Sequence, residues 1–434
     1  MKHQNTKNLS IGIVGTGIAG MGCGYFLHKN NRIALYEAND YVGGHTNTVT
    51  VEEDGTEIPI DTGFMVYNEA TYPNLVKLFR ELNVETANTS MSFSVQHVPT
   101  GLEFSGSSLN HLFAQRRNLL SPRFIRMLWE INRFNTECLE VLADDKYSSY
   151  TLQEYVTEKG FGQEMLMKYL IPMSSAVWST PPDRMLGFPA VTLVRFFKNH
   201  GFLGLHTQHQ WKTVVGGTRK YRDKLIAPFR SSIFTGNPVV RVTRKARHVE
   251  VLFADGSRAL HDRVILACHA VDALRVLDNP TPQERRVLGE FHYQHNTATL
   301  HTDERGMPKT RLAWSSWNYR LDVNERGEPT PSTVYYMNSL QRVSNKRNYF
   351  LSIDDPRLVD PKLILKTIDY AHPLFSLGAI NAQKELPRLN ESGPVYFCGS
   401  YFKYGFHEDA FTSALDLCRS IAAGHAWSDT REAA

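Results

Sequence analysis

The sequence predicts an α/β fold in which a Rossmann-like nucleotide-binding domain is interleaved with a second, α+β domain. Three observations predict it. A glycine-rich turn joins an apolar strand to an apolar helix near the start of the chain. A second strand ends in an acidic residue at the spacing typical of such a nucleotide-binding unit. Near the end of the chain another apolar strand leads through a glycine into a helix.

The segment "SIGIVGTGIAG" predicts a strand, a turn and the start of a helix. Gly15, Gly17 and Gly20 follow the order Gly-x-Gly-x-x-Gly. In this pattern the first glycine makes the tight turn, the second lets the backbone approach a pyrophosphate, and the third lets the helix pack on the strand. The backbone amides at the helix start, at Ile18 and Ala19, are then expected to face the phosphates.

The next strand, residues 32–38, ends in Glu37 and Ala38. Glu37 follows Gly15 by 22 residues, where an acid holds the ribose hydroxyls of an adenosine. Because an acid disfavours a 2'-phosphate at this place, NADP is not the nucleotide that we expect.

A second pair of glycines follows this strand. The segment "YVGGHTNTV" holds Gly43, Gly44, His45 and Thr46, and adjacent glycines let the chain pass close to a bound dinucleotide again. The segment "IPIDTGFMVYN" then forms an Asp-x-Gly strand. We expect three of its residues beside the nucleotide, Gly63, Phe64 and Met65.

These segments resemble the flavin-containing amine oxidoreductase superfamily, which holds monoamine and polyamine oxidases, protoporphyrinogen oxidase and phytoene desaturases. The shared features are the glycine turn, the acid after the second strand, a Gly-Gly-Arg-x-x-Thr-like segment and the Asp-x-Gly strand. The resemblance implies a GR2-type domain with FAD as its cofactor. His45 stands where the family usually has arginine, so the phosphate or flavin contact would be made through an imidazole.

Later segments extend the resemblance. "WKTVVGGTRKYRDKLI" is similar to the family's Gly-Gly turn before a helix, and residues 236–268 predict a series of strands. In the family the first of these strands contacts adenine through its backbone, which implies that role for Val239. An ordinary sheet position is the alternative for this residue.

The closing segment "GPVYFCGSYFKYGFHEDAFTSALDLC" resembles the family's last strand, flavin loop and helix. The start of that helix would face the pyrimidine edge of the flavin and stabilise the negative charge that accumulates there on reduction. The resemblance implies flavin contacts from Gly399, Ser400, Phe406, Glu408, Asp409 and Ala410. The two acids are also residues that any helix start favours. Cys398 does not match the family's covalent flavin cysteine, so we expect non-covalent FAD.

The nucleotide-binding segments divide the chain into two sets. We expect an FAD-binding domain from residues 1–67, 211–284 and 386–434, and a substrate-binding domain from residues 68–210 and 285–385. Within the second set, residues 297–321 and 332–341 are dense in aromatic, amide and hydroxyl side chains and are expected to form its sheet. Strands of this kind often wall an apolar pocket with a few polar anchors.

The segment "SPRFIRMLWEINRFNTECLEVLADD" predicts one long helix, which Ser121 caps and whose apolar face continues to Leu142. Five arginines lie near it and favour a contact with a membrane surface, namely Arg116, Arg117, Arg123, Arg126 and Arg133. The alternative is a buried domain helix with a solvated basic side. We favour the alternative because acids interrupt the positive face at Glu130, Glu137 and Glu140.

The expected function is that of an FAD-dependent oxidoreductase that removes a hydride from a small apolar or lipid substrate. The aromatic segments and the "GFHEDA" ending resemble a bacterial branch of the superfamily whose genes often lie beside enzymes such as cyclopropane-fatty-acid synthase. This implies a modified fatty acyl chain and a desaturase or oxidase reaction. The side chains that we expect to act in catalysis are His407, Tyr404 and Trp317.

Three other functions stay open. An amine oxidase would need an aromatic cage and a lysine-held water beside the flavin, and the sequence does not place that lysine. A flavin-binding redox sensor or scaffold would bind FAD without turnover. A nicotinamide-dependent dehydrogenase would carry no flavin.

Composition excludes several further classes. Lys and Arg outnumber Asp and Glu by only 48 to 44, which argues against a nucleic-acid partner. Five scattered cysteines without a CxxC pair support neither a disulfide framework nor a metal site. The polar N-terminus lacks the apolar core of a signal peptide, and no 18 apolar residues run together. We therefore expect a cytoplasmic protein that is at most peripheral to the inner membrane, and the sequence carries no signal of its oligomeric state.

Overall fold

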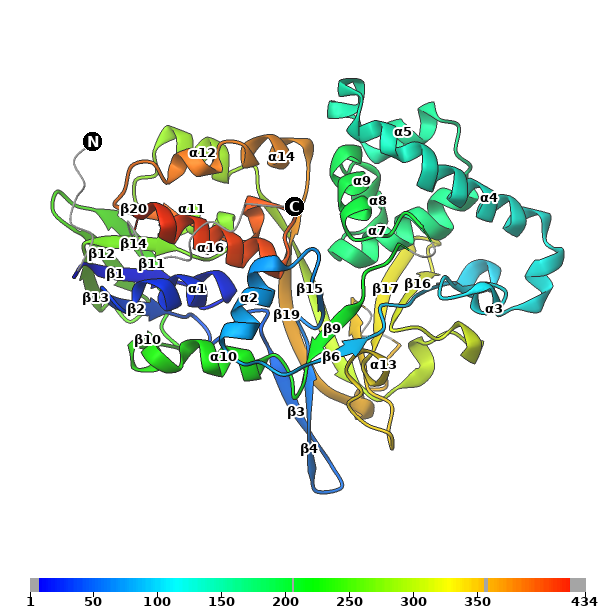
Figure 1. Ribbon diagram of the computed structural model, residues 1–434, viewed down its shortest axis with the longest axis horizontal. Coiled ribbons are helices and arrows are strands. Elements are labelled where there is room, and N and C mark those ends of the chain that lie inside the picture. Colours follow the sequence, from blue (N-terminus) through cyan, green and yellow to red (C-terminus); the bar gives the residue numbers. More distant parts are fainter. Residues whose placement is uncertain (1–7, 205–206, 355–357, 422–434) are drawn as a thin grey trace.

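The computed structural model describes residues 8–204, 207–354 and 358–421. The chain forms two lobes side by side, a parallel sheet with its helices on the left of Figure 1 and a larger antiparallel sheet with a helical part on the right. This mixed α/β architecture confirms the predicted fold class.

The sheet of the first lobe is built from segments that are far apart in the sequence. Its five strands are all parallel and contribute buried residues to the apolar core. In spatial order they are β10 (Ile233–Phe234), β2 (Arg32–Tyr36), β1 (Ser10–Val14), β14 (Arg263–Leu266) and β20 (Val395–Phe397).

The first and last helices of the described chain pack together against this sheet. These are α1 (Ile18–Leu27) and α16 (His407–Ile421), which lie side by side in Figure 1. A Cβ at Gly22 would lie 3.1 Å from the Phe411 ring, so a glycine lets the two helices approach closely. The first and last helices of the described chain therefore share one core.

Further elements complete the first lobe. An antiparallel sheet of β11 (Val239–Arg244), β12 (Val249–Phe253) and β13 (Arg258–His261) packs on it. The remaining helices are α10 (Arg219–Ile226), α11 (Ala270–Val276), α12 (Pro282–Leu288), α14 (Leu377–Gln383) and α15 (Leu386–Leu389).

The sheet of the second lobe has seven strands, which pair antiparallel except for the parallel pair of β16 with β7. In spatial order they are β19 (Ile364–Leu374), β15 (His292–His301), β18 (Phe350–Ile353), β17 (Pro329–Tyr336), β16 (Trp317–Val323), β7 (Phe93–His97) and β8 (Leu102–Ser105). The expected strand at 332–341 stops early, because residues 337–341 form helix α13 (Met337–Gln341). The Gln341 side chain bonds to Asp61 of the neighbouring hairpin at this point.

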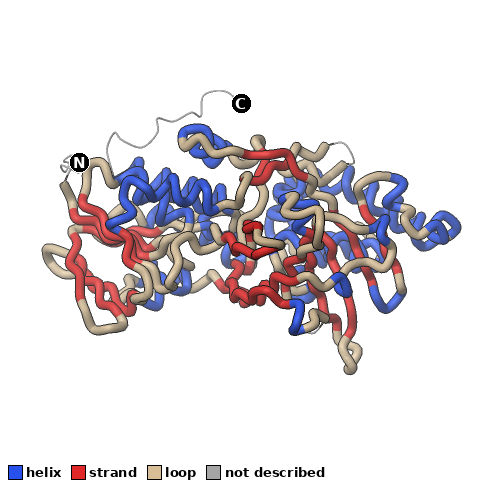
Figure 2. Tube along the Cα trace, turned by 90° about the horizontal axis from the view of Figure 1, so that it is seen from below, coloured by secondary structure: helices blue, strands red, loops and turns tan. Residues whose placement is uncertain are grey.

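The helical part of the second lobe lies at the far end of the molecule from the N-terminus (Figure 2). Its helices are α3 (Leu109–Leu112), α4 (Pro122–Glu137), α5 (Leu152–Glu158), α6 (Gln163–Met165), α7 (Ile171–Trp178), α8 (Pro182–Leu186) and α9 (Ala190–Asn199). Ser121 caps α4 as predicted, since its hydroxyl accepts from the Phe124 amide at 3.3 Å. The predicted helix is too long, because residues 138–142 form a 3-10 turn that keeps Cys138 and Val141 buried.

Short elements join the lobes. They are the hairpin β3 (Thr48–Glu53) and β4 (Thr56–Asp61), helix α2 (Pro73–Glu81), and a sheet of β5 (Tyr67–Asn68), β9 (Trp211–Val214) and β6 (Thr86–Thr89). The parallel sheet draws only on the residue ranges expected for the FAD-binding domain, and the seven-stranded sheet only on those expected for the substrate-binding domain. The sheet of β5, β9 and β6 draws on both.

Candidate active site

A cavity of about 550 Å³ lies where the two lobes meet. The carboxyl ends of the parallel strands open into it, as expected for a ligand site in an α/β sheet. Gly15, Glu37, Ala267 and Gly399 line it where β1, β2, β14 and β20 end.

The first glycine turn fits a pyrophosphate. A Cβ at Gly20 would lie 2.0 Å from the Gly15 carbonyl oxygen, so the helix packs on the turn only with glycine there. A Cβ at Gly17 would meet nothing within 4 Å, because this residue faces the cavity. Helix α1 has no side-chain cap and no acid in its first turn, so its first amides stay free for an anion.

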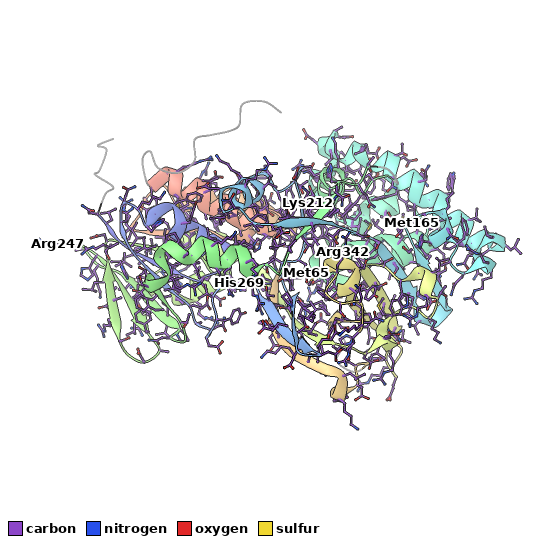
Figure 3. The ribbon with its side chains drawn as sticks, turned by 60° about the horizontal axis from the view of Figure 1, so that its bottom comes forward. Met65, Met165, Lys212, Arg247, His269 and Arg342 are labelled. Atoms are coloured by element: carbon purple, nitrogen blue, oxygen red, sulfur yellow. The ribbon has the colours of Figure 1, made fainter. Side chains whose placement is uncertain are left out.

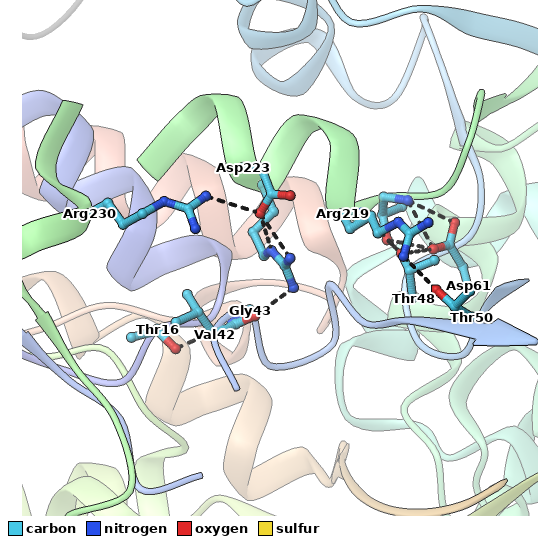
Figure 4. A network of polar contacts seen from close by, with 11 residues as sticks. Thr16, Val42, Gly43, Thr48, Thr50, Asp61, Arg219, Asp223 and Arg230 are labelled. Carbon is cyan, nitrogen blue, oxygen red and sulfur yellow. Dashed lines mark hydrogen bonds and ion pairs between the residues drawn. The ribbon is translucent and has the colours of Figure 1, made fainter. Parts of the chain in front are cut away.

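The second glycine pair crosses over this turn. Gly44 has φ +56°, and a Cβ on it would lie 3.3 Å from the Gly17 Cα. The Gly43 amide donates to the Thr16 hydroxyl at 3.3 Å, and Arg222 donates to the Val42 carbonyl at 3.2 Å (Figure 4). These bonds hold the crossing segment against the first turn.

Glu37 lies buried at the cavity wall, as the ribose partner should. Its Oε2 accepts from the Thr16 amide at 3.1 Å and hydroxyl at 2.5 Å, and its Oε1 accepts from the Asn39 amide and side chain at 3.0 Å. The carboxylate and the Asn39 side chain both line the cavity. Together they present an acceptor and a donor to ribose hydroxyls.

Helix α16 points its first residue at the other end of the cavity. The His407 ring stacks on Phe64 with centroids 3.9 Å apart, and its Nε2 lies 2.5 Å from the Tyr221 hydroxyl. Burial lowers the pKa of His407 to about 3, so the ring is neutral. Tyr221 also bonds to Thr46, at 2.6 Å.

His45 is a neutral imidazole in the position where the family usually has arginine. Burial, with smaller contributions from His372, His269 and His407, holds the pKa of His45 well below its ordinary value. Its Nε2 has no hydrogen-bond partner among the described residues, and its ring lines the cavity. A buried polar atom of this kind needs a ligand to complete it.

A further histidine lines the cavity from β19. His372 Nδ1 lies 2.7 Å from Asn296 Oδ1, and burial lowers the pKa of His372 to about 4. The ring lies edge-on to His45, with centroids 5.4 Å apart. His372 is therefore neutral near pH 7 and held in one orientation.

The second lobe gives the cavity an aromatic and apolar wall. The lining side chains on this side are Tyr72, Met91, Val177, Trp178, Phe196, Phe202, Trp211, Trp317, Tyr335 and Phe406. Of these, Tyr72 and Trp211 belong to the elements that join the lobes, and Phe406 precedes α16 of the first lobe. Among the described residues, the cavity is lined by three charged side chains, those of Glu37, Asp272 and Arg275, which follow strands of the first lobe. No lysine of the described chain lines it. The described part of the chain also holds no cluster of three side chains suited to bind a metal.

Most of the predicted site residues meet at this cavity. Its lining includes Gly15, Gly17, Ile18, Ala19, Glu37, Ala38, Gly44, His45, Gly63, Phe64, Met65, Trp317, Val239, Gly399, Ser400, Phe406, His407 and Ala410. Met65 and His269, both lining residues, lie near the centre of the molecule in Figure 3. Outside the lining are Gly20, Gly43, Thr46, Tyr404, Glu408 and Asp409.

The residues outside the lining support its walls. Glu408 is buried against α2 and accepts from the amides of Asn74 and Leu75, at 3.0 and 2.9 Å, so it caps that helix. Asp409 accepts from the amides of Phe406 and Tyr404 in the preceding loop. Asp409 thus serves the start of its own helix and Glu408 the start of α2, and neither residue lines the cavity.

Tyr404 is turned toward the helical part of the second lobe. Its backbone carbonyl accepts from the Trp178 indole at 3.2 Å, and its ring packs with the apolar cluster there. Cys398 is fully buried, with its sulfur 3.7 Å from that of Cys23. It lies outside the cavity lining, which agrees with non-covalent FAD.

Sequence reasoning missed the residues that reach the cavity from distant segments. His372, Trp178, Phe196 and Trp211 carry no local motif, and only the tertiary fold places them together. Pro373 lies inside β19, and a proline in such a run argues against a strand, so the local sequence hid this element.

Comparisons with known proteins match this geometry. The family model for flavin containing amine oxidoreductase matches residues 18–338, about three quarters of the chain. An L-amino-acid oxidase of Pseudechis australis is 21% identical over 320 residues, which cover 68% of this chain but only 58% of that oxidase. A 15-cis-phytoene desaturase of Synechococcus elongatus is 35% identical over 78 residues, 18% of this chain and 16% of the desaturase.

Solved structures share the fold at low identity. A putrescine oxidase superimposes with a TM-score of 0.69 at 16% identity, covering 95% of this chain and 99% of the oxidase. A CLA-producing fatty acid isomerase from P. acnes superimposes with a TM-score of 0.66 at 13% identity, covering 95% of this chain and 98% of the isomerase. The first glycine turn, the acid after β2 and the start of α16 fit FAD, and FAD is the cofactor. The chain belongs to the flavin-containing amine oxidoreductase family.

Proposed function

We propose that the protein is an FAD-dependent oxidoreductase that dehydrogenates an apolar substrate, the acyl chain of a modified fatty acid. The observation that carries this proposal is the wall of the second lobe, where aromatic and apolar side chains line the cavity without a charged group among the described residues. A wall of this kind binds hydrocarbon and excludes water from the reacting carbons.

Two polar groups in that wall fit a carboxyl or carbonyl group of an acyl lipid. The indole N–H groups of Trp211 and Trp317 are buried and have no partner among the described residues, and both rings line the cavity. Each unpaired donor carries a desolvation cost of about 1–3 kcal/mol, which an acceptor on the substrate would offset. Trp317, expected as a catalytic residue, thus takes a binding role in this proposal.

Dehydrogenation removes a hydride from one carbon and a proton from its neighbour and leaves a double bond. Bound FAD supplies the hydride acceptor and passes the electrons on to oxygen or another oxidant. The chain must supply the proton acceptor, and His372 meets the requirements. Its Nδ1 is occupied by Asn296, its ring lines the cavity, and no described group bonds to its Nε2.

Anaerobic mixing with candidate substrates tests the proposal. Purified yellow protein should lose its flavin absorbance with unsaturated or methyl-branched acyl lipids and keep it with primary amines or amino acids. Bleaching by amines alone would establish the alternative of an amine oxidase. That alternative is favoured by the family match and by the likeness to the putrescine oxidase fold. It is disfavoured because no lysine among the described residues lines the cavity to hold a water beside the flavin.

A redox sensor or scaffold would behave differently in the same assay. No lipid or amine would bleach the flavin, while chemical reduction would change the binding of a partner. A colourless protein whose denatured supernatant lacks flavin would instead indicate a nicotinamide-dependent dehydrogenase. It would exclude every function that depends on a bound flavin.

A further inference from the structure

One surface of the second lobe exposes large apolar side chains together with arginines. It covers helix α3, the 3-10 turn Arg116–Leu120 and the start of α4, at the right-hand end of the molecule in Figure 1. The docking face, as we call it, consists of Leu109, Arg116, Arg117, Leu119, Leu120, Arg123, Ile125, Arg126 and Trp129.

The apolar members of this face are unusually open to solvent. Leu120 is 89% exposed, Leu109 70%, Trp129 61%, Leu119 53% and Ile125 45%. Exposed apolar groups that gather on one segment mark an interaction surface, whereas scattered ones do not. The fold itself does not need these side chains, since helix α4 meets its core through other residues.

Helix α4 has an inner and an outer side. Phe124, Met127 and Phe134 are buried in the core of the helical part. Ile125 and Trp129 are one turn apart and therefore share the opposite side. The Ser121 cap fixes where the helix begins, so it also fixes which residues point outward.

The charge of the docking face has one sign. Between Phe104 and Trp129 the sequence has four arginines and no Asp or Glu. Other exposed positions of the outer side of α4 are uncharged, namely Pro122, Asn132 and Thr136. The face thus combines apolar groups with a net positive charge.

Of the acids that interrupt the arginines in the sequence, Glu130 pairs with one arginine of the face, Arg126, and the other two pair with residues outside it. The Glu130 side chain is only 3% exposed, and it accepts from the Gly162 amide at 3.2 Å and from Arg126 at 3.2 Å. Glu140 is paired with Lys159 and accepts from the Tyr155 hydroxyl. Glu137 is paired with Arg133 beyond the face. Three arginines of the face, Arg116, Arg117 and Arg123, form no ion pair with these acids.

We infer that this face docks the protein on an anionic lipid bilayer. The leucines and Ile125 would enter the boundary between headgroups and acyl chains, Trp129 would lie at the level of the headgroups, and the arginines would contact lipid phosphates. Anionic lipid complements both properties of the face at once, which free phosphate or an acidic protein without apolar groups would not. The described chain holds no helix able to span the bilayer, so this contact is peripheral.

Vesicle sedimentation of the FAD-loaded protein tests the inference. The protein should pellet with vesicles of phosphatidylcholine and phosphatidylglycerol, stay in the supernatant with phosphatidylcholine alone, and be released by salt. Leu120→Asp should weaken binding at least about tenfold, because it removes a leucine that would enter the bilayer and adds a negative charge that anionic lipid repels. Arg123→Gln should weaken it about fivefold.

Matched controls come from the other end of the molecule. Leu260→Asp changes a leucine of β13 that is 58% exposed, and Arg247→Gln changes an exposed arginine at the opposite end from α4 (Figure 3). Both should bind vesicles like the parent protein. All variants should keep their flavin and their bleaching by a substrate dispersed in detergent, which separates this inference from the proposed function.

Three results would overturn the inference. Equal binding of Leu120→Asp and the parent protein would exclude the face. Equal binding to neutral and anionic vesicles would exclude the role of the arginines. A dimer that dissociates with Leu120→Asp, without any vesicle binding, would show that a second copy of the chain covers the face instead.

Discussion

Asn296 Oδ1 lies 2.7 Å from His372 Nδ1, and this pair fixes which nitrogen of the histidine carries its proton. The Asn296 amide nitrogen already donates to the Asp354 carboxylate and to the Ser179 carbonyl. Its oxygen must therefore face the ring and accept a proton from Nδ1. The lone pair of His372 is left on Nε2, as a proton acceptor requires.

Replacing His372 by glutamine should slow anaerobic flavin bleaching by an acyl substrate about a hundredfold, since general base catalysis typically contributes at least that much. FAD content should not change. His292→Gln is the control, because His292 is an exposed histidine in the neighbouring strand β15. If both variants bleach at the parent rate, the proton is taken up by another group.

The rate of bleaching should also report the pKa of His372, which burial lowers to about 4. A base works only when it is deprotonated, so the rate should be constant from pH 8 to about pH 6 and fall as the pH approaches 4. Stopped-flow reduction across this range measures it. A midpoint near the ordinary value of about 6.5 would mean that His372 is solvated in the working protein.

Gly17→Ala should weaken FAD binding at least about tenfold, the equivalent of one lost hydrogen bond to a charged group. The new methyl would point into open space at the cavity, where the pyrophosphate approaches the start of α1. The apoprotein should keep its melting temperature, because the methyl meets no protein atom. Gly106→Ala, at an exposed glycine whose Cβ is equally unobstructed, should change neither quantity.

Glu408 should make the protein less stable as the pH rises. Burial raises the pKa of Glu408 to about 7, above the 4.5 of an unfolded glutamate, although four hydrogen bonds oppose the shift. Its contribution to stability is complete below pH 4.5 and is lost as the pH rises through 7. Glu408→Gln should remove up to about 3 kcal/mol of that pH dependence.

Urea unfolding at pH 4.5, 6 and 7.5 measures how the free energy of unfolding changes with pH in each variant. The exposed Glu391→Gln serves as the control. If the free energy of unfolding of Glu408→Gln changes with pH as that of the parent protein does, the Glu408 carboxylate stays ionised against α2.

The variant Tyr221→Phe tests whether the hydrogen-bonded pair of Tyr221 and His407 has a structural or a catalytic role. The change removes the nearer partner of the buried His407 Nε2, leaves the Thr46 hydroxyl at 3.4 Å, and should cost about 1–3 kcal/mol of unfolding free energy. Bleaching should stay within a few-fold of the parent rate, because this pair holds the start of α16 and does not move a proton. Tyr25→Phe, which breaks an exposed hydroxyl bond to Glu81, should cost less than about 1 kcal/mol.

The local parts of the site could be predicted from the sequence, and the distant parts could not. The Gly-x-Gly-x-x-Gly turn and the acid at Glu37 are short-range patterns with fixed geometry, so their place in the fold followed from spacing alone. His372 reaches the cavity because β19 pairs with β15, and Asn296 on β15 supplies its partner. Pairings of this kind leave no periodic sign in either segment.

The end of α4 and the role of Glu408 illustrate two further limits. Apolar spacing continues unbroken from Phe134 through Cys138 and Leu142, so periodicity could not show that the helix tightens into a 3-10 turn. An acid in the first turn of α16 looks like any helix-start residue. That Glu408 caps a different helix, α2, depends on a contact across more than 300 residues of sequence.

The shared core of α1 and α16 also sets the order of events during synthesis. Strand β20 and helix α16 follow the other elements of the first lobe in the described chain and are therefore synthesised after them. Until then β14 is an unprotected sheet edge and α1 lacks the helix that covers it. We therefore expect truncated chains that stop before Val395 to be colourless, because they lack the start of α16, and to associate through the open edge of β14.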